Sequence, residues 1–215
     1  MKTRKLTPEI LDHLPVDDPD AIRSRSDLKK VNELGGNFRW MLSRLRGLEI
    51  APGAPVIELG AGDGTFASYL SKHFPDTNYT ALDLAPRPEG FPDQWQWRQQ
   101  DIFDGLELDS DSIVLANLFL HHFTDDQLGQ LGESLKNCRA LIFSEPERNV
   151  MFRGLGCLTQ TVFQFNHVTK HDMHVSIEAG FKGMELINAM HLENRKNHLE
   201  HSLLGFYRLV SKHRS

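Results

Sequence analysis

The sequence predicts an α/β fold, a doubly wound seven-stranded sheet preceded by an N-terminal helical extension. Three observations predict it. From Pro55 onward, short apolar runs of β type alternate with segments of helical periodicity. A run of glycines follows the first of these strands, as in open parallel sheets that bind a ligand. The stretch between the last two predicted strands is long for a tight hairpin and lacks a helical pattern, which favours an antiparallel final pair.

The first 50 residues are predicted to form a helical cap, and residues 51–215 the main domain. Asp18 followed by Pro19 is a typical helix start, because proline suits the first helical position. The helical pattern continues to about Leu48. Two neighbouring glycines, Gly35 and Gly36, separate two differently directed apolar faces and predict a kink or a break.

The main domain is predicted to contain strands at 56–59, 78–82, 95–99, 112–117, 140–144, 183–189 and 203–210. Segments 65–73 and 125–137 have the pattern of crossover helices. The stretch 190–202, "MHLENRKNHLEHS", which contains three histidines, is predicted to be a solvated loop.

The composition and charge of the chain predict a soluble protein that does not bind nucleic acid or span a membrane. The chain has 215 residues, 40% of them hydrophobic and 25% charged, which is ordinary for a soluble domain. A net charge of −5 gives no basic field for nucleic acid or an anionic membrane. No apolar run is long enough to span a bilayer or to serve as a signal peptide. Cys138 and Cys157 lack metal or redox spacing, so we expect reduced thiols and a cytoplasmic protein.

The glycine run lies in "VIELGAGDGTF", residues 56–66. Gly60, Gly62 and Gly64 have the spacing G-x-G-x-G, whereas dinucleotide sites favour G-x-G-x-x-G. Glu58 and Asp63 flank these glycines. Carboxylates there would oppose a pyrophosphate and favour a ligand that carries an ammonium or sulfonium group.

Two further carboxylates follow the next two strands. Asp83 ends the second strand, where it can accept hydrogen bonds from both hydroxyls of a ribose. Asp101 follows the third strand and is placed to meet the exocyclic amine of an adenine. Taken alone, the glycine run could be a plain turn and Asp83 a helix cap. Acidic residues at the ends of three successive strands favour a ligand-binding site instead.

Together, "VIELGAGDGTF", "ALDLA", "QQDIF" and "IVLANLFLHHF" resemble class I S-adenosylmethionine-dependent methyltransferases over residues 55–210. The resemblance implies the sheet order 3-2-1-4-5-7-6 with the seventh strand antiparallel, and S-adenosylmethionine (SAM) as cofactor. The resemblance also implies which residues bind the cofactor. The methionine part would lie at Glu58, Gly60, Ala61, Gly62 and Gly64, the ribose at Asp83 and Leu84, the adenine at Asp101 and Ile102, and the sulfonium at Asn117.

Methyl transfer requires alignment of the nucleophile with the methyl group, and a base if the acceptor is a hydroxyl. His121 and His122 follow the fourth strand, and histidine titrates near neutral pH. His122 is the leading candidate for a catalytic residue, with His121 as the second. Because paired histidines at this place accompany varied acceptors in the family, a positioning role is equally open.

Two other residues are weaker candidates for the base. Glu145 follows the fifth strand, but it could instead cap a helix or pair with Arg148 or Arg153. His171 opens the predicted helix before the sixth strand, but it could instead be part of a surface cap. A metal site of His121, His122 and Glu145 is disfavoured, because the metal-dependent members of the family place acidic or amide groups at both strand ends. No metal is therefore expected.

The expected acceptor is a small aromatic, polyketide-like or quinone-like molecule, methylated on oxygen or carbon. An apolar stripe from Met151 to Phe165 is either core or a lid over the cofactor. "HLPVDDPDAIRSRSDLKKVN" and "EPERN…TKHDMHVSIEAGF" resemble a bacterial group associated with type III polyketide synthases. Two alternatives are a protein or RNA methyltransferase, disfavoured by the negative charge and the absence of an "NPPY"-like turn, and a non-catalytic SAM-binding module. The oligomeric state is open.

Overall fold

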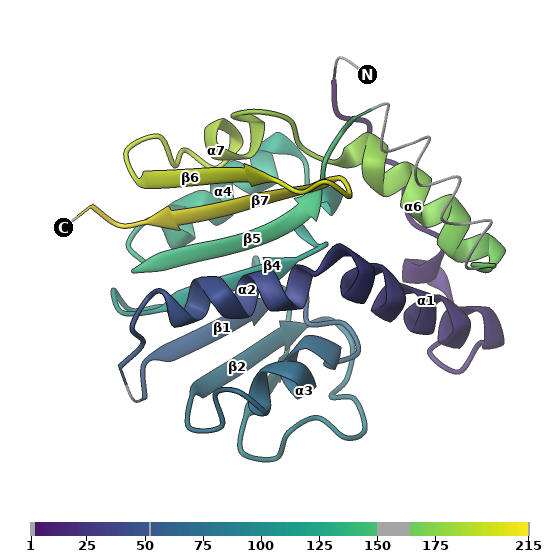
Figure 1. Ribbon diagram of the computed structural model, residues 1–215, viewed down its shortest axis with the longest axis horizontal. Coiled ribbons are helices and arrows are strands. Elements are labelled where there is room, and N and C mark those ends of the chain that lie inside the picture. The colour runs from purple at the N-terminus through teal and green to yellow at the C-terminus, as the bar shows by residue number, and fades with distance from the viewer. Residues whose placement is uncertain (1–2, 52, 150–163, 215) are drawn as a thin grey trace.

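The computed structural model describes residues 3–51, 53–149 and 164–214. It contains one seven-stranded sheet in the order β3-β2-β1-β4-β5-β7-β6, in which β7 runs antiparallel to both neighbours (Figure 1). The predicted fold class and strand order are confirmed. The strands are β1 Pro55–Leu59, β2 Asn78–Asp83, β3 Gln96–Gln99, β4 Ile113–Asn117, β5 Ala140–Pro146, β6 Lys196–His201 and β7 Phe206–Lys212.

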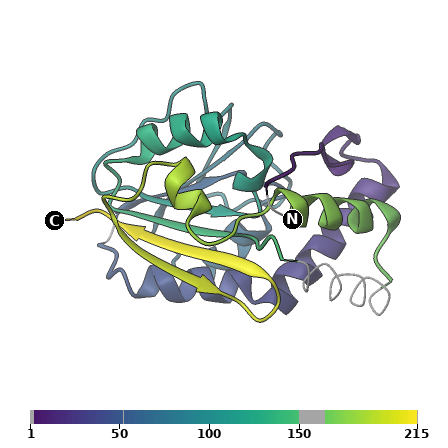
Figure 2. The same cartoon turned by 90° about the horizontal axis from the view of Figure 1, so that it is seen from above.

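Helices cover both faces of the sheet, and α2 and α4 lie on opposite sides of it in Figure 2. β4 and β5 are the central strands, and their near-continuous apolar sequence is buried, as expected for parallel strands covered on both faces. The helices are α1 Pro19–Gly35, α2 Asn37–Arg46, α3 Thr65–Ser71, α4 Asp125–Leu135, α6 His167–Ala179 and α7 Glu185–Ala189, with short 3₁₀ helices η1 Leu11–His13 and η2 Leu120–His122. No helix in the described part of the chain combines the length and the apolar character of a membrane span.

The N-terminal helices form as the sequence predicts. The side chain of Asp18 caps α1 by accepting hydrogen bonds from the backbone N–H groups of Asp20 and Ala21. Gly36, with φ of 66°, ends α1 in the left-handed conformation and begins α2. α2 packs into the same apolar cluster as β1 and α3, so it is continuous with the main domain. The domain boundary at residue 50 stays a prediction.

α1 leaves the sheet and packs against α6 beyond the carboxyl ends of the parallel strands (Figure 1). Its buried face is partly polar. The Ser24 hydroxyl donates a hydrogen bond to Asn166, and Asp27 accepts one from the Asn166 N–H. By contrast Ile22, an apolar residue of the same helix, is 54% exposed. Hydrogen bonding therefore contributes directly to the contact between α1 and α6.

The sixth strand differs from the prediction. Segment 183–189 contains the helix α7 instead, in which Leu186 and Ile187 are buried near α4. The sixth strand is β6, within the stretch predicted to be a loop, and it joins β7 by a short turn. β6 is an edge strand of mostly polar residues, so its sequence lacks the apolar signal of a central strand. The antiparallel final pair is confirmed, although the long connection from which it was inferred does not exist.

Candidate functional site

Residues at the carboxyl ends of the parallel strands form two neighbouring regions. The first is the glycine loop, residues 60–64, between β1 and α3. The second is the histidine centre, defined here as Glu9, His121, His122 and Glu145, which lies beyond β4 and β5.

The glycine loop has a conformation that suits only glycine at three positions. Gly60, Gly62 and Gly64 have φ values of 66°, 57° and 69°. A side chain at Gly60 would also overlap the ring of Phe119, only 2.1 Å from the position of an added Cβ. At Gly62 the same position has no neighbour within 4 Å among the described residues. Gly62 is therefore the place where a ligand can approach the backbone.

Asp83 lies directly at this loop. Its Oδ2 accepts a hydrogen bond of 2.7 Å from the N–H of Gly62, and its Oδ1 accepts one of 2.9 Å from the N–H of Ala85. Of the neighbouring predicted residues, Ala61 is buried and Leu84 is 69% exposed. The carboxylate thus stands at the end of β2 with a defined orientation, beside the open side of Gly62.

Glu58 is a buried carboxyl group under the loop. It accepts a hydrogen bond from the hydroxyl of Tyr79, whose ring stacks on Trp95 with centroids 4.3 Å apart. Burial raises the pKa of Glu58 to about 8, and the nearby Asp83 adds to this effect, although the hydrogen bond from Tyr79 opposes it. At neutral pH the group is therefore mostly protonated, and a cation bound nearby would favour its ionisation.

Asn117, at the end of β4, links the loop region to α1. Its Nδ2 donates a hydrogen bond of 3.0 Å to Asn32. Its Oδ1 is buried and has no hydrogen-bond partner in the described part of the chain, so a ligand with an N–H or O–H group would satisfy it. On the same helix, the Nζ of Lys29 lies 3.3 Å from Oδ2 of Asp63. The part α1 plays at the loop was not anticipated from the sequence.

Asp101 and Ile102 follow β3. Asp101 accepts a hydrogen bond of 2.9 Å from the N–H of Phe103, which forms a local turn, and its side chain is partly exposed. Ile102 is buried in the core cluster that also contains Leu59 and Leu82. None of the contacts recorded for the described residues ties Asp101 to the glycine loop.

Glu145 fixes η2, the short helix that carries His121 and His122. This fully buried carboxylate accepts hydrogen bonds from the N–H groups of Phe119, Leu120 and His121, at 2.9–3.3 Å. It also lies 2.8 Å from Nδ1 of His121. These backbone hydrogen bonds cap the start of η2, so the helix-cap alternative is the one that the structure shows. Arg148 pairs instead with Glu185. Arg153 lies outside the described residues.

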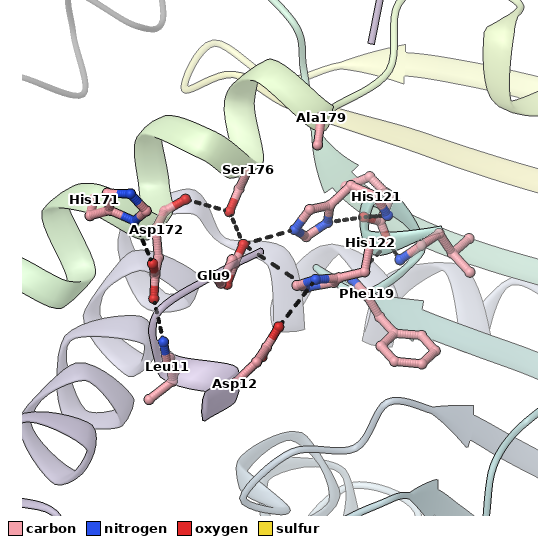
Figure 3. Close-up of polar contacts among 12 residues, drawn as sticks. Glu9, Leu11, Asp12, Phe119, His121, His122, His171, Asp172, Ser176 and Ala179 are labelled. Atoms are coloured by element: carbon pink, nitrogen blue, oxygen red, sulfur yellow. Dashed lines mark hydrogen bonds and ion pairs between the residues drawn. The ribbon is translucent and has the colours of Figure 1, made fainter. Parts of the chain in front are cut away.

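Glu9 joins the two histidines from the opposite side (Figure 3). One of its carboxylate oxygens, Oε1, lies 3.3 Å from Nε2 of His121 and 4.0 Å from Nε2 of His122. The hydroxyl of Ser176 on α6 donates to the same oxygen. Asp12 Oδ2 lies 3.6 Å from the other ring nitrogen of His122, Nδ1. Sequence reasoning missed both Glu9 and Asp12, and no local pattern marks them, since Glu9 and His121 are 112 positions apart.

The N-terminal segment that carries Glu9, residues 3–17, is held by Arg4. This guanidinium donates hydrogen bonds to the carbonyl oxygens of Ala179, His121 and Phe123, and forms an ion pair of 2.7 Å with Asp125. Farther along the segment, the carboxylate of Asp172 accepts hydrogen bonds from the N–H groups of Ile10 and Leu11. These contacts fix Glu9 against α6 and η2.

The two adjacent histidines differ in charge. Burial lowers the pKa of His121, but its hydrogen bonds to Glu145 and Glu9 outweigh this and raise the pKa to about 9. Burial and the neighbouring His121 lower the pKa of His122 to about 4. In the ligand-free protein at neutral pH, His121 is therefore an imidazolium between two carboxylates, and His122 is neutral.

His171 lies apart from this pair. It belongs to α6, its Nδ1 is 3.0 Å from Asp172, and its side chain is 43% exposed. Figure 3 shows it on the far side of Asp172 from His121 and His122. Of the predicted apolar stripe, Met151 and most other members lie outside the described residues, and Phe165 is buried.

No protein-family model and no curated protein match the chain. Solved structures do. The plantazolicin methyltransferase BpumL in complex with SAH is similar with a TM-score of 0.65 and 13% identity, covering 92% of each chain. Human N-acetylserotonin methyltransferase in complex with SAM is similar with a TM-score of 0.61 and 15% identity, and the match covers 95% of this chain and 61% of that one. Magnesium protoporphyrin IX methyltransferase from Synechocystis with bound SAH is similar with a TM-score of 0.62 and 13% identity, and the match covers 93% of this chain and 96% of that one. This chain therefore has the fold of these methyltransferases.

Proposed function

We propose that this protein is a SAM-dependent methyltransferase that acts on a small molecule. The observation that carries the proposal is the geometry of the glycine loop, where the Asp83 carboxylate is held beside the unobstructed backbone of Gly62. Carboxylates at this place suit ribose hydroxyls and a positively charged ligand. The likeness to folds that were crystallised with SAM or SAH supports the same cofactor.

The proposed cofactor contacts follow the order of the strands. The methionine part lies along Glu58, Gly60, Ala61, Gly62 and Gly64, the ribose at Asp83 and Leu84, and the adenine at Asp101 and Ile102. The buried, unpartnered Oδ1 of Asn117 accepts a hydrogen bond from the amino group of the methionine part. Glu58 provides a second, ionisable acceptor on the same side.

The proposed acceptor end is the histidine centre, because η2 begins only three residues after Asn117, the last residue of β4. His122 is its exposed member, with 28% of the side chain accessible, and is the residue placed to contact the acceptor. His121 is buried and positions the turn. His171 stays a more distant candidate on the surface of α6.

The proposed acceptor is a small aromatic, polyketide-like or quinone-like molecule. Two of the similar structures are named for small molecules, N-acetylserotonin and magnesium protoporphyrin IX. In the reaction, a lone pair of the acceptor attacks the methyl carbon while the carbon–sulfur bond breaks, and S-adenosylhomocysteine leaves with that electron pair. The protein aligns the two reactants and excludes water.

Calorimetric titration with SAM, S-adenosylhomocysteine and NAD tests the cofactor assignment. We expect micromolar binding of the first two and none of NAD. Asp83→Ala should weaken SAM binding by about 150-fold or more, because two hydrogen bonds to a charged acceptor are lost at roughly 1.5–3 kcal/mol each. Arg87→Ala, in the exposed loop that follows Asp83, is the control and should bind SAM normally. Unchanged affinity in Asp83→Ala would refute the proposed site.

A further inference from the structure

We propose that Glu9, His121 and His122 form a binding site for one divalent transition-metal ion of the zinc type. One ligand atom from each residue, two ring nitrogens and a carboxylate oxygen, lies within 4.8 Å of the other two. The three come from two segments that are far apart in sequence, and they meet beside α6 (Figure 3). Two imidazoles with one carboxylate are a ligand set that catalytic zinc sites use, with the fourth position open.

The distances suit such an ion. Zinc binds nitrogen and oxygen ligands at about 2.0–2.2 Å, so two ligands of a tetrahedral ion lie about 3.3–3.5 Å apart. Nε2 of His121 is already 3.3 Å from Oε1 of Glu9. Nε2 of His122 is 4.0 Å from the same oxygen, which a small side-chain rotation would correct.

The second ring nitrogens carry an independent sign of a metal site. A histidine that binds a metal usually directs its other ring nitrogen at a carboxylate or carbonyl, which fixes the ring. Here His121 does so through a hydrogen bond, and His122 faces a carboxylate at a longer distance. Nδ1 of His121 lies 2.8 Å from Glu145, and Nδ1 of His122 lies 3.6 Å from Asp12. Both Nε2 atoms are thereby directed at Glu9, which is itself held by Ser176.

This arrangement differs from the ligand set considered from the sequence. From the sequence, Glu145 was considered as the third ligand of a metal site that was disfavoured, and no metal was expected. In the structure Glu145 accepts hydrogen bonds from three backbone N–H groups and orients His121, while Glu9 lies at the third ligand position. The ligand set is therefore two histidines and a carboxylate from another part of the chain.

The open position of the ion would face the accessible side of His122. His121 is 4% exposed and Glu9 13%, whereas His122 is 28% exposed. This step rests on the proposed function: the ion holds a phenol or enol oxygen of the acceptor and lowers its pKa, and the hydroxyl proton passes to solvent. The oxygen then forms the bond to the methyl carbon as the carbon–sulfur bond breaks, and S-adenosylhomocysteine is released.

The test uses the full chain after treatment with a chelator. Titration with Zn²⁺ by calorimetry should give one ion per chain, and titration with Co²⁺ should produce the visible absorption of a four- or five-coordinate site. Glu9→Gln and His122→Ala should each weaken Zn²⁺ binding at least tenfold. His198→Gln is the matched control, because His198 is also paired with a glutamate, Glu200, at 2.9 Å but lies on β6.

The absence of stoichiometric binding in the wild type, or equal affinity in all three variants, would overturn the metal site. Because the Co²⁺ spectrum needs no substitution, the site can be refuted even if a variant does not fold. SAM binding is measured on the same samples. Metal binding without SAM binding would support the metal site and refute the proposed function. SAM binding without metal binding would support the proposed function and refute the metal site.

Discussion

The glycine loop and the histidine centre lie at the same edge of the sheet, but they are built in different ways. The loop consists of five consecutive residues and the carboxylate of Asp83, 21 positions from Gly62. The histidine centre joins Glu9 to His121 across 112 positions, and His121 to Glu145 across 24. The loop depends on backbone conformation, whereas the centre depends on tertiary packing and buried charge.

Phe119 connects the two regions. Its N–H donates to Glu145 in the histidine centre, and its ring occupies the space in front of Gly60 in the glycine loop. A change in either region can therefore reach the other through one side chain. Variants in each region can test how different the two regions are.

Replacing His121 by alanine should give the largest loss of stability. Glu9 and Glu145 would both remain buried without their shared partner, and breaking a buried charge pair costs about 3–5 kcal/mol. Urea denaturation in the presence of a chelator measures the effect on the metal-free protein. His171→Ala, which removes a half-exposed histidine beside Asp172, should cost less than about 1 kcal/mol. Equal losses in the two variants would show that the centre is not held by buried charge.

Glu58 should make stability fall as the pH rises, opposite to the usual behaviour of carboxylates. Its folded-state pKa is about 8 against an ordinary value of 4.5, so between these values the folded state retains a proton that the unfolded state has lost. Stability should decrease across this window by an amount on the order of a few kcal/mol. In Glu58→Gln this contribution should disappear. Thermal unfolding at pH 5, 6.5 and 8 measures it, and parallel pH profiles for both proteins would contradict the assignment.

Gly60 and Gly62 form a matched pair. Both have positive φ, so alanine at either position costs roughly 1–2 kcal/mol in backbone strain. At Gly60 an added methyl group also overlaps Phe119, which adds about 1–3 kcal/mol. Gly60→Ala should therefore be the less stable variant in urea denaturation, and Phe119→Ala should rescue part of its loss. An equal stability of the two variants would contradict the close packing of Phe119.

The smallest effect is expected for Lys29→Ala. The ion pair of Lys29 with Asp63 is solvent-exposed, with the two side chains 50% and 27% accessible. Such pairs contribute at most about 1 kcal/mol, and less in salt. Unfolding in low and high salt should differ little between variant and wild type. A loss comparable to that of His121→Ala would show that α1 is held on the loop mainly by charge.

The difference between the regions explains how much the sequence could predict. The loop, Asp83 and the strand order depend on local motifs, and the break at Gly36 follows from backbone conformation. β6 was missed because an edge strand needs no continuous apolar face. His121 and His122 were found beside β4, but Glu9 could not be found, because only the docking of Arg4 and Asp172 brings it to them.

The contacts of Arg4 and Glu9 have a consequence for the order in which the molecule is completed during synthesis. A ribosome releases these two residues long before their partners on η2 and α6, which lie 112 to 175 positions later in the chain. The glycine loop can take shape once β2 has emerged, whereas the histidine centre must wait until α6 has left the ribosome. Contacts of such high sequence separation form slowly, because a long loop must close first. The histidine centre is therefore expected to be among the last parts of the nascent chain to become native.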